Sequence, residues 1–153
     1  MTLLVACGTR NNEPQVEGHY TYEHAFNYNL QGNHFDVHEI GTMDFYTDGT
    51  ALDSAQQVYT VTRPEEDTVT YVFNYVSPSR WSLEGDTFFF AGIKECFRMV
   101  PDKEDDLSQE IVRVVSGSID YQYKFHLDTL TEEKMQWSFT YRDGHSDTWE
   151  FYR

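Results

Sequence analysis

The chain has 153 residues, a length typical of one domain with one hydrophobic core. Its 26 aspartate and glutamate residues outnumber its 11 lysine and arginine residues, and the net charge of -15 argues against nucleic acid or an anionic lipid surface as a partner. The same acidity either keeps the protein soluble or attracts cations and basic partners.

Aromatic side chains make up 16% of the chain, a share that favours pleated sheet over helix. The two cysteines, Cys7 and Cys96, lie far apart, and neither has the neighbouring cysteine or histidine spacing of a structural zinc site. In an oxidising compartment the two cysteines could form a disulfide, unless Cys7 is lipidated. We expect no cofactor.

Residues 1–17 are predicted to form an N-terminal anchor and tether. A short apolar run from Leu3 to Ala6 precedes Cys7, and the small Gly8 follows it. This pattern resembles the lipobox of bacterial lipoproteins, and the resemblance implies a diacylglycerol on the Cys7 thiol. The leader is shorter than a signal peptide, so we expect it to be truncated. The alternative is an apolar N-terminus with an incidental cysteine, and the polar segment 9–17 is predicted to be a tether.

From Gly18 to the end, apolar and polar residues alternate in short segments separated by turn signals, which indicates antiparallel strands. Asp48-Gly49 and Gly85 mark hairpin turns, and Ser77-Pro78-Ser79 is predicted to be a further turn. The expected strands lie within residues 43–45, 50–62, 69–75, 81–83, 88–90, 93–99, 119–127, 137–141 and 149–153. Segment 107–115 fits either a strand or a short helix, and we favour a strand. Eight to ten short strands are typical of a barrel or sandwich.

Three stretches resemble the small lipocalin-like lipoproteins of bacteria, a calycin-type group. They are Gly41-Thr42-Met43-Asp44-Phe45-Tyr46-Thr47-Asp48-Gly49-Thr50, Trp81-Ser82-Leu83-Glu84-Gly85-Asp86 and the ending from Leu130 through Met135, Trp137 and Gly144 to Phe151-Tyr152-Arg153. The resemblance implies an all-β fold, an antiparallel up-and-down barrel of about eight strands over residues 18–153. It also implies that Arg153 covers the ring of Tyr20, which stands where calycins usually carry tryptophan.

Metal binding has one candidate site. His34, Asp36 and His38 alternate, so on a strand they would share one face, with Glu39 and His24 within reach. The alternative is a solvent-facing strand on which such a triplet arises by chance.

No catalytic signature is recognised, so we do not predict an enzyme. The serines have no nucleophile elbow, and the acidic runs at 65–67 and 104–106 are typical of solvated loops. Cys96 is expected to be a small buried residue, with a reactive thiol as the alternative if Lys94 and Arg98 share its face. A perturbed carboxylate among clustered acids in a cleft would favour an enzyme instead.

The alternating aromatic residues are the main candidates for binding a small molecule. Inward side chains of an eight-stranded barrel either fill its interior or line a pocket. The pocket candidates are Tyr71, Phe73, Tyr121, Tyr123, Phe125, Trp137, Phe139 and Trp149. Outward-facing tryptophans would instead stack on sugar rings.

We therefore expect a lipoprotein of the bacterial cell envelope, at the outer membrane, that binds a small apolar ligand or a partner protein. The alternative is a non-catalytic module with a filled core that binds glycans or acts as an envelope scaffold. A cavity of about 300 Å³ or more would favour the ligand binder.

Overall fold

A computed structural model of the chain describes residues 15–153, so Cys7 lies outside the described part. The strands are β1 (Gly18–Leu30), β2 (Asn33–Phe45), β3 (Thr50–Thr62), β4 (Val69–Glu84), β5 (Thr87–Gly92), β6 (Arg98–Pro101), β7 (Tyr123–Leu130), β8 (Lys134–Thr140) and β9 (Ser146–Tyr152). One α-helix, α1 (Asp106–Ser118), and a short 3-10 helix, η1 (Lys94–Cys96), are inserted between β5 and β7. Among residues 15–153, no helix combines the length and the apolar composition needed to cross a lipid bilayer.

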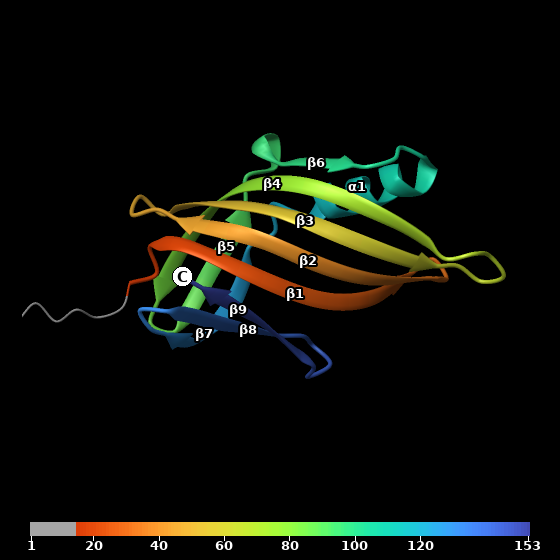
Figure 1. Cartoon of the computed structure of the whole chain (residues 1–153). Helices are drawn as coiled ribbons and strands as arrows, with labels where there is room; N and C mark the ends of the chain where they lie inside the picture. Colours follow the sequence, from red (N-terminus) through yellow and green to blue (C-terminus); the bar gives the residue numbers. More distant parts are fainter. Residues whose placement is uncertain (1–14) are drawn as a thin grey trace, which may run out of the picture.

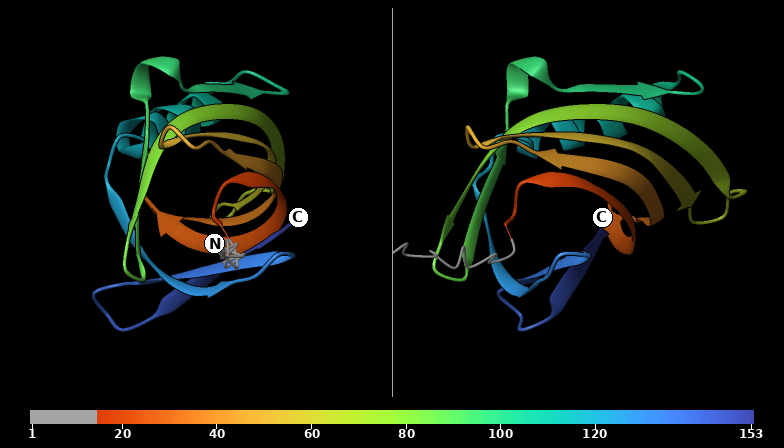
Figure 2. Two further views of the ribbon diagram at one scale, coloured as in Figure 1. Left: turned by 90° about the vertical axis from the view of Figure 1, so that its left-hand side faces the viewer. Right: turned by 60° about the vertical axis from the view of Figure 1, so that its left-hand side comes forward.

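Eight antiparallel strands close into a barrel (Figures 1 and 2). The ring runs in the order β3-β2-β1-β9-β8-β7-β5-β4, and pairing of β3 with β4 closes it. The predicted all-β barrel of about eight strands is thereby confirmed. β6 adds to β4 at Phe73–Val76, whereas β5 pairs with β4 further along at Ser79–Glu84.

The tight turns occur where the sequence predicts them. The β2–β3 turn contains Gly49 and the β4–β5 turn contains Gly85, with φ values of 81° and 64° that suit glycine. Within the first of these turns, Asp48 accepts hydrogen bonds from both the backbone N–H and the hydroxyl of Thr50.

The predicted turn at Ser77-Pro78-Ser79 is wrong, because β4 continues through it. Pro78 pairs with Leu52 of β3 and falls between the segments of β4 that bond β6 and β5. A missing N–H is tolerated at such a gap in the ladder. The carbonyl of Pro78 instead accepts a hydrogen bond from Ile93 N–H at 2.7 Å.

The strand favoured for residues 107–115 is also wrong, because this segment forms α1. Asp105 caps the helix: its carboxylate accepts from Ser108 N–H at 2.8 Å, and the Ser108 hydroxyl accepts from Asp105 N–H at 2.9 Å. This reciprocal capping box satisfies two backbone donors at the helix start. In the same region, the strand expected over 93–99 is interrupted by η1.

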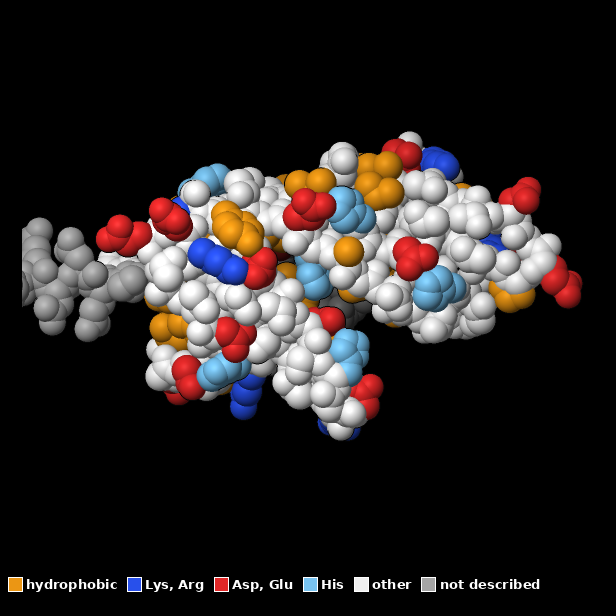
Figure 3. All heavy atoms as spheres, turned by 60° about the horizontal axis from the view of Figure 1, so that its bottom comes forward, with side chains coloured by type: hydrophobic (Ala, Val, Ile, Leu, Met, Phe, Trp, Pro, Cys, Tyr) orange, Lys and Arg blue, Asp and Glu red, His pale blue; other side chains and the backbone are white. Residues whose placement is uncertain are grey.

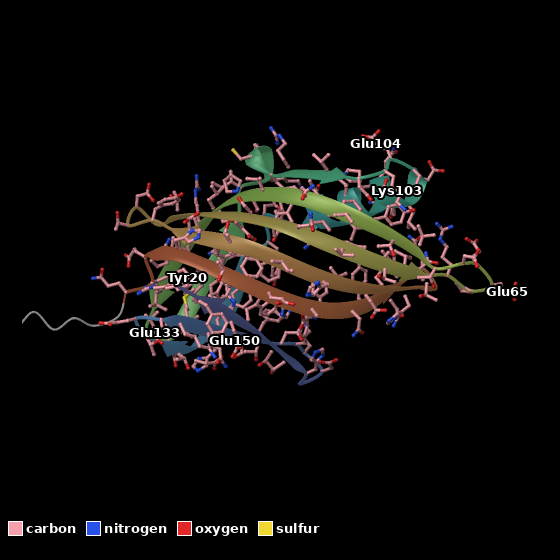
Figure 4. All side chains as sticks on the ribbon, in the orientation of Figure 1. Tyr20, Glu65, Lys103, Glu104, Glu133 and Glu150 are labelled. Atoms are coloured by element: carbon pink, nitrogen blue, oxygen red, sulfur yellow. The ribbon has the colours of Figure 1, made fainter. Side chains whose placement is uncertain are left out.

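The interior contains two apolar clusters. The first surrounds Tyr20 and Trp137. The second lies toward the β3–β4 turn and includes Phe35, Tyr59 and Ile111 of α1, so the helix packs against this end of the sheet. Figure 4 shows the two ends, with Tyr20 at one and Glu65, Lys103 and Glu104 at the other.

The predicted contact between Arg153 and Tyr20 is present where β1 meets β9. The guanidinium carbon lies 4.9 Å from the ring centroid, and Nη2 donates to the Tyr20 hydroxyl at 2.6 Å. The same guanidinium also donates to the backbone carbonyls of Gln15 and Glu17, which holds the start of the described chain against the barrel.

Candidate functional site

A pocket of about 400 Å³ lies inside the barrel between the two clusters. Strands from around the ring and the C-terminal part of α1 contribute to its wall. Its lining is mostly aromatic and apolar, with a few polar groups: Tyr22, His24, Phe26, Glu39, Met43, Asp53, Gln57, Tyr75, Ser77, Phe90, Gly92, Phe97, Val115, Ile119, Tyr123, Phe125, Trp137, Phe139, Tyr141, Asp147, Trp149 and Phe151.

The pocket opens where β1 and β9 separate. These strands pair only at Thr21 and Tyr22 of β1, while the rest of β1 continues without β9 beside it. At this point the rings of His24 from β1 and Trp149 from β9 pack against each other, with centroids 4.4 Å apart. Figure 3 shows the molecule hollowed on this face.

Five of the eight predicted pocket residues line this cavity, namely Tyr123, Phe125, Trp137, Phe139 and Trp149. Tyr71 and Phe73 do not, because they are fully packed in the second cluster. Tyr121 also does not, because it precedes β7 and is 63% exposed.

Side chains of four neighbouring strands meet in a buried polar cluster at the pocket. The hydroxyl of Tyr22 lies 2.5 Å from Glu39 Oε1 and 2.7 Å from Asp53 Oδ1. The hydroxyl of Tyr75 lies 2.7 Å from the same Glu39 oxygen and 2.7 Å from Asp53 Oδ2. The two hydroxyls are 3.1 Å apart, and Gln57 donates its amide to Glu39 Oε2 at 2.7 Å. We call these five residues the Tyr–carboxylate cluster.

The strand register explains how this cluster forms. Tyr22 pairs with Gly41, Gly41 with Ala55, and Ala55 with Tyr75, so two small residues separate two tyrosines in one row across β1–β4. A Cβ on Gly41 would lie 2.8 Å from the Tyr22 hydroxyl, so only glycine leaves room for that ring. Glu39 and Asp53 belong to the rows on either side, and therefore both carboxylates face the tyrosine hydroxyls.

Burial perturbs the acid–base behaviour of the cluster. Loss of solvent, together with the nearby charge of Glu39, raises the pKa of Asp53 to about 7. Burial and the adjacent Asp53 and Glu39 carboxylates raise the pKa of Tyr22 and of Tyr75 far above the ordinary value. Both tyrosines are therefore proton donors at every physiological pH, and Asp53 exchanges a proton near neutrality.

Two nitrogen atoms of the pocket wall lack hydrogen-bond partners among residues 15–153. They are Nε1 of Trp137, whose side chain is 3% exposed, and Nε2 of His24. Burial lowers the pKa of His24, so its ring is neutral near pH 7. Buried polar atoms are normally paired, so these two unpartnered atoms are an unusual feature of the pocket wall.

The predicted metal triplet is not assembled. His34 lies 3.2 Å from Asp36, but His38 pairs instead with Glu23 of β1 at 2.6 Å. All of these groups lie on the outer, exposed face of the strands. Within the described part of the chain, no group of three or more histidine, cysteine or acidic residues is placed to hold a metal ion.

Cys96 is exposed, in contrast to the buried position that we expected. It lies in η1, where strand alternation no longer determines which side chains share a face. Arg98 uses its guanidinium to donate to the backbone carbonyls of Glu95 and Phe97, and Lys94 is 4.0 Å from Asp120. The neighbouring cations are thus directed to other partners.

A wider hollow of about 1110 Å³ lies over the outer wall of β1, β2, β3 and β9. Its lining consists mainly of outward-facing residues such as Thr21, Ile40 and Gln56. It includes Tyr22 and Tyr75 but neither Glu39 nor Asp53, so the inner pocket, which all five cluster residues line, is the better candidate for specific binding.

The sequence-derived candidates therefore include much of the apolar wall, and from the Tyr–carboxylate cluster they include only Glu39, as a neighbour of the candidate metal triplet. A scan against protein-family models finds none that matches the chain, and a search of curated proteins finds no match either.

Proposed function

We propose that this barrel binds one small, largely apolar molecule in its inner pocket. The observation that carries the proposal is the cavity of about 400 Å³, which is enclosed mostly by aromatic rings and includes a few polar groups. Pockets for small molecules typically have this composition, in which apolar walls provide affinity and a few polar atoms fix the orientation. A barrel with a purely structural interior would be filled by its own side chains.

We also propose that this binding takes place at the bacterial cell envelope. Support comes from the lipobox-like sequence around Cys7, which precedes the described residues. The polar residues 9–14 would then connect a lipid anchor to the barrel, since Gln15, Val16 and Glu17 already pack against it.

The tryptophans favour the ligand binder over a glycan-binding surface. Trp137 is buried, and Trp81 and Trp149 pack against the first apolar cluster from its edge. None of the three is among the exposed large hydrophobic residues of the described chain, so stacking of sugars on an outer tryptophan patch has no support.

Acid–base catalysis is a second candidate function, favoured by one observation. Asp53 lies in a cleft beside Glu39, and its pKa of about 7 suits proton transfer near neutral pH. A catalyst would convert its ligand, whereas a binding protein would release it unchanged. Mass spectrometry of a bound molecule before and after incubation distinguishes the two.

Ligand binding is tested with N-phenyl-1-naphthylamine, an uncharged dye whose emission increases in apolar surroundings. We expect saturable, one-to-one binding. Val115→Trp should weaken it at least about tenfold, because Val115 lines the pocket from α1 and the larger ring would occupy the cavity.

Val100→Trp is the matched control, because Val100 lies on β6 with 60% of its surface exposed. It adds the same ring outside the barrel and should leave dye binding unchanged. Circular dichroism verifies that both variants are folded. The absence of saturable binding to the unaltered chain, or equal binding by a folded Val115→Trp variant, would contradict the proposal.

A further inference from the structure

The inner pocket carries negative charge and has no positive side chain to balance it. Glu39 and Asp53 lie in the Tyr–carboxylate cluster, and Asp147 belongs to the lining near the opening. Within residues 15–153, no lysine or arginine lines this pocket, and its one histidine, His24, is held neutral by burial. The field inside the barrel therefore repels carboxylates and phosphates and attracts cations.

We infer that the molecule bound in this pocket is an organic cation, an apolar or aromatic body bearing a protonated amine that pairs with Glu39 and Asp53. The inference rests on the ligand-binding function proposed above and adds the charge class of the ligand.

The Tyr–carboxylate cluster has fewer hydrogen-bond donors than its contacts require. Five oxygen–oxygen contacts of 2.5 to 3.1 Å join the hydroxyls of Tyr22 and Tyr75 to each other and to the carboxylates of Glu39 and Asp53. Each hydroxyl supplies one proton, and Asp53 supplies a third when it is protonated. Even three protons cannot occupy five contacts, so the cluster is short of donors. An ammonium group supplies three N–H donors together with a compensating positive charge.

The rest of the wall suits the remainder of such a molecule. The face of an aromatic ring attracts a cation, and Phe125, Trp137 and Trp149 form one connected group of rings along the pocket. Trp137 lines the pocket, and its buried Nε1–H has no partner among residues 15–153, so an acceptor atom on the bound molecule would pair with it once the ring shifts toward the cavity. A metal ion would use neither the rings nor this donor.

The test compares three molecules that share one ring system and differ in charge. They are 1-naphthylmethylamine (a cation), 1-naphthalenemethanol (neutral) and 1-naphthoic acid (an anion), each measured near neutral pH by displacement of N-phenyl-1-naphthylamine. We expect the amine to bind at least about tenfold more tightly than the alcohol and the acid to bind at least about tenfold more weakly. This comparison uses the unaltered chain, so it does not depend on any variant folding.

Variants then locate the charge selectivity. Glu39→Gln and Asp53→Asn should reduce the advantage of the amine over the alcohol by about tenfold while leaving the affinity for the alcohol within about twofold. Asp36→Asn is the matched control, because it removes one negative charge from the exposed face of the same strand as Glu39. It should preserve the full selectivity.

The possible results separate this inference from the proposed function. If all three molecules bind equally and Val115→Trp prevents their binding, the pocket is a ligand site and the inference about charge is wrong. If none binds and the dye does not bind either, the proposed function itself is wrong. Selectivity for the amine that Glu39→Gln and Asp53→Asn leave intact would also overturn the assignment to this cluster.

Discussion

The buried carboxyl of Asp53 should make the stability of the protein fall as the pH rises. Its pKa is raised from an ordinary value of 3.8 to about 7, first by burial and then by the charge of Glu39. A raised pKa in the folded state means that folding favours the protonated acid. This stabilisation is fully present below pH 3.8 and is lost as the pH rises through about 7.

The size of the effect follows from the interval between the two pKa values. Each unit of difference between the two pKa values corresponds to about 1.4 kcal/mol of unfolding free energy. Ionising Asp53 in the folded protein therefore costs roughly 4 kcal/mol of stability by pH 8. Asp53→Asn keeps the shape and cannot ionise. Relative to the unaltered chain, the variant should therefore gain up to about 4 kcal/mol of unfolding free energy between pH 4 and pH 8.

Urea denaturation followed by tryptophan fluorescence measures both proteins at each pH. Repulsion among the surface acids affects both proteins equally, because the variant retains all of these acids. It therefore cancels in the difference between the two unfolding free energies. A difference in unfolding free energy that stays constant from pH 4 to pH 8 would refute the argument, because Asp53 would then titrate equally in the folded and unfolded chains.

Three further changes in stability are expected, each measured by the same denaturation assay. Gly41→Ala should cost about 1–3 kcal/mol, because its Cβ would meet Ala55 at 2.7 Å, whereas Gly117→Ala in α1 meets nothing within 4 Å and should be neutral or stabilising. Arg153→Ala should cost about 1–2 kcal/mol by uncovering the Tyr20 ring, and no loss would show that the contact is unimportant. Asp105→Ala should cost about 1 kcal/mol and reduce helical circular dichroism by removing the cap of α1.

Local signals explain why much of the barrel is predictable from the sequence. Asp48-Gly49 and Gly85 specify tight turns, and the alternation of Tyr123 and Phe125 specifies an inward face, because each signal acts over only a few residues. The apolar wall of the pocket follows from that alternation, and five of its predicted residues are present.

The errors arise where a local pattern fits two structures. The Asp105–Ser108 capping box is present in the sequence, yet the apolar residues that follow it fit a short strand as well as a helix. Pro78 normally marks a turn, but here it occupies the gap between two partners of one long strand. Whether such a segment forms a helix, a turn or a continuous strand depends on neighbouring strands that lie far away in the sequence.

The Tyr–carboxylate cluster could not be predicted for a similar reason. Its members come from four strands, and they meet only because the register places Gly41 and Ala55 between Tyr22 and Tyr75. In the sequence, Asp53 looks like an ordinary solvent-facing acid, and Glu39 stands out only as a neighbour of the candidate metal triplet. The one available signal is the small residue at position 41, which becomes informative once its cross-strand neighbours are known.

A crystal structure of the chain with 1-naphthylmethylamine tests the central claim most directly. We predict the naphthyl ring in contact with Phe125 and Trp149 on the pocket side and the amine nitrogen within about 3 Å of carboxylate oxygens of Glu39 and Asp53. An empty pocket at saturating amine, or amine bound only to the outer wall of the barrel, would contradict the account.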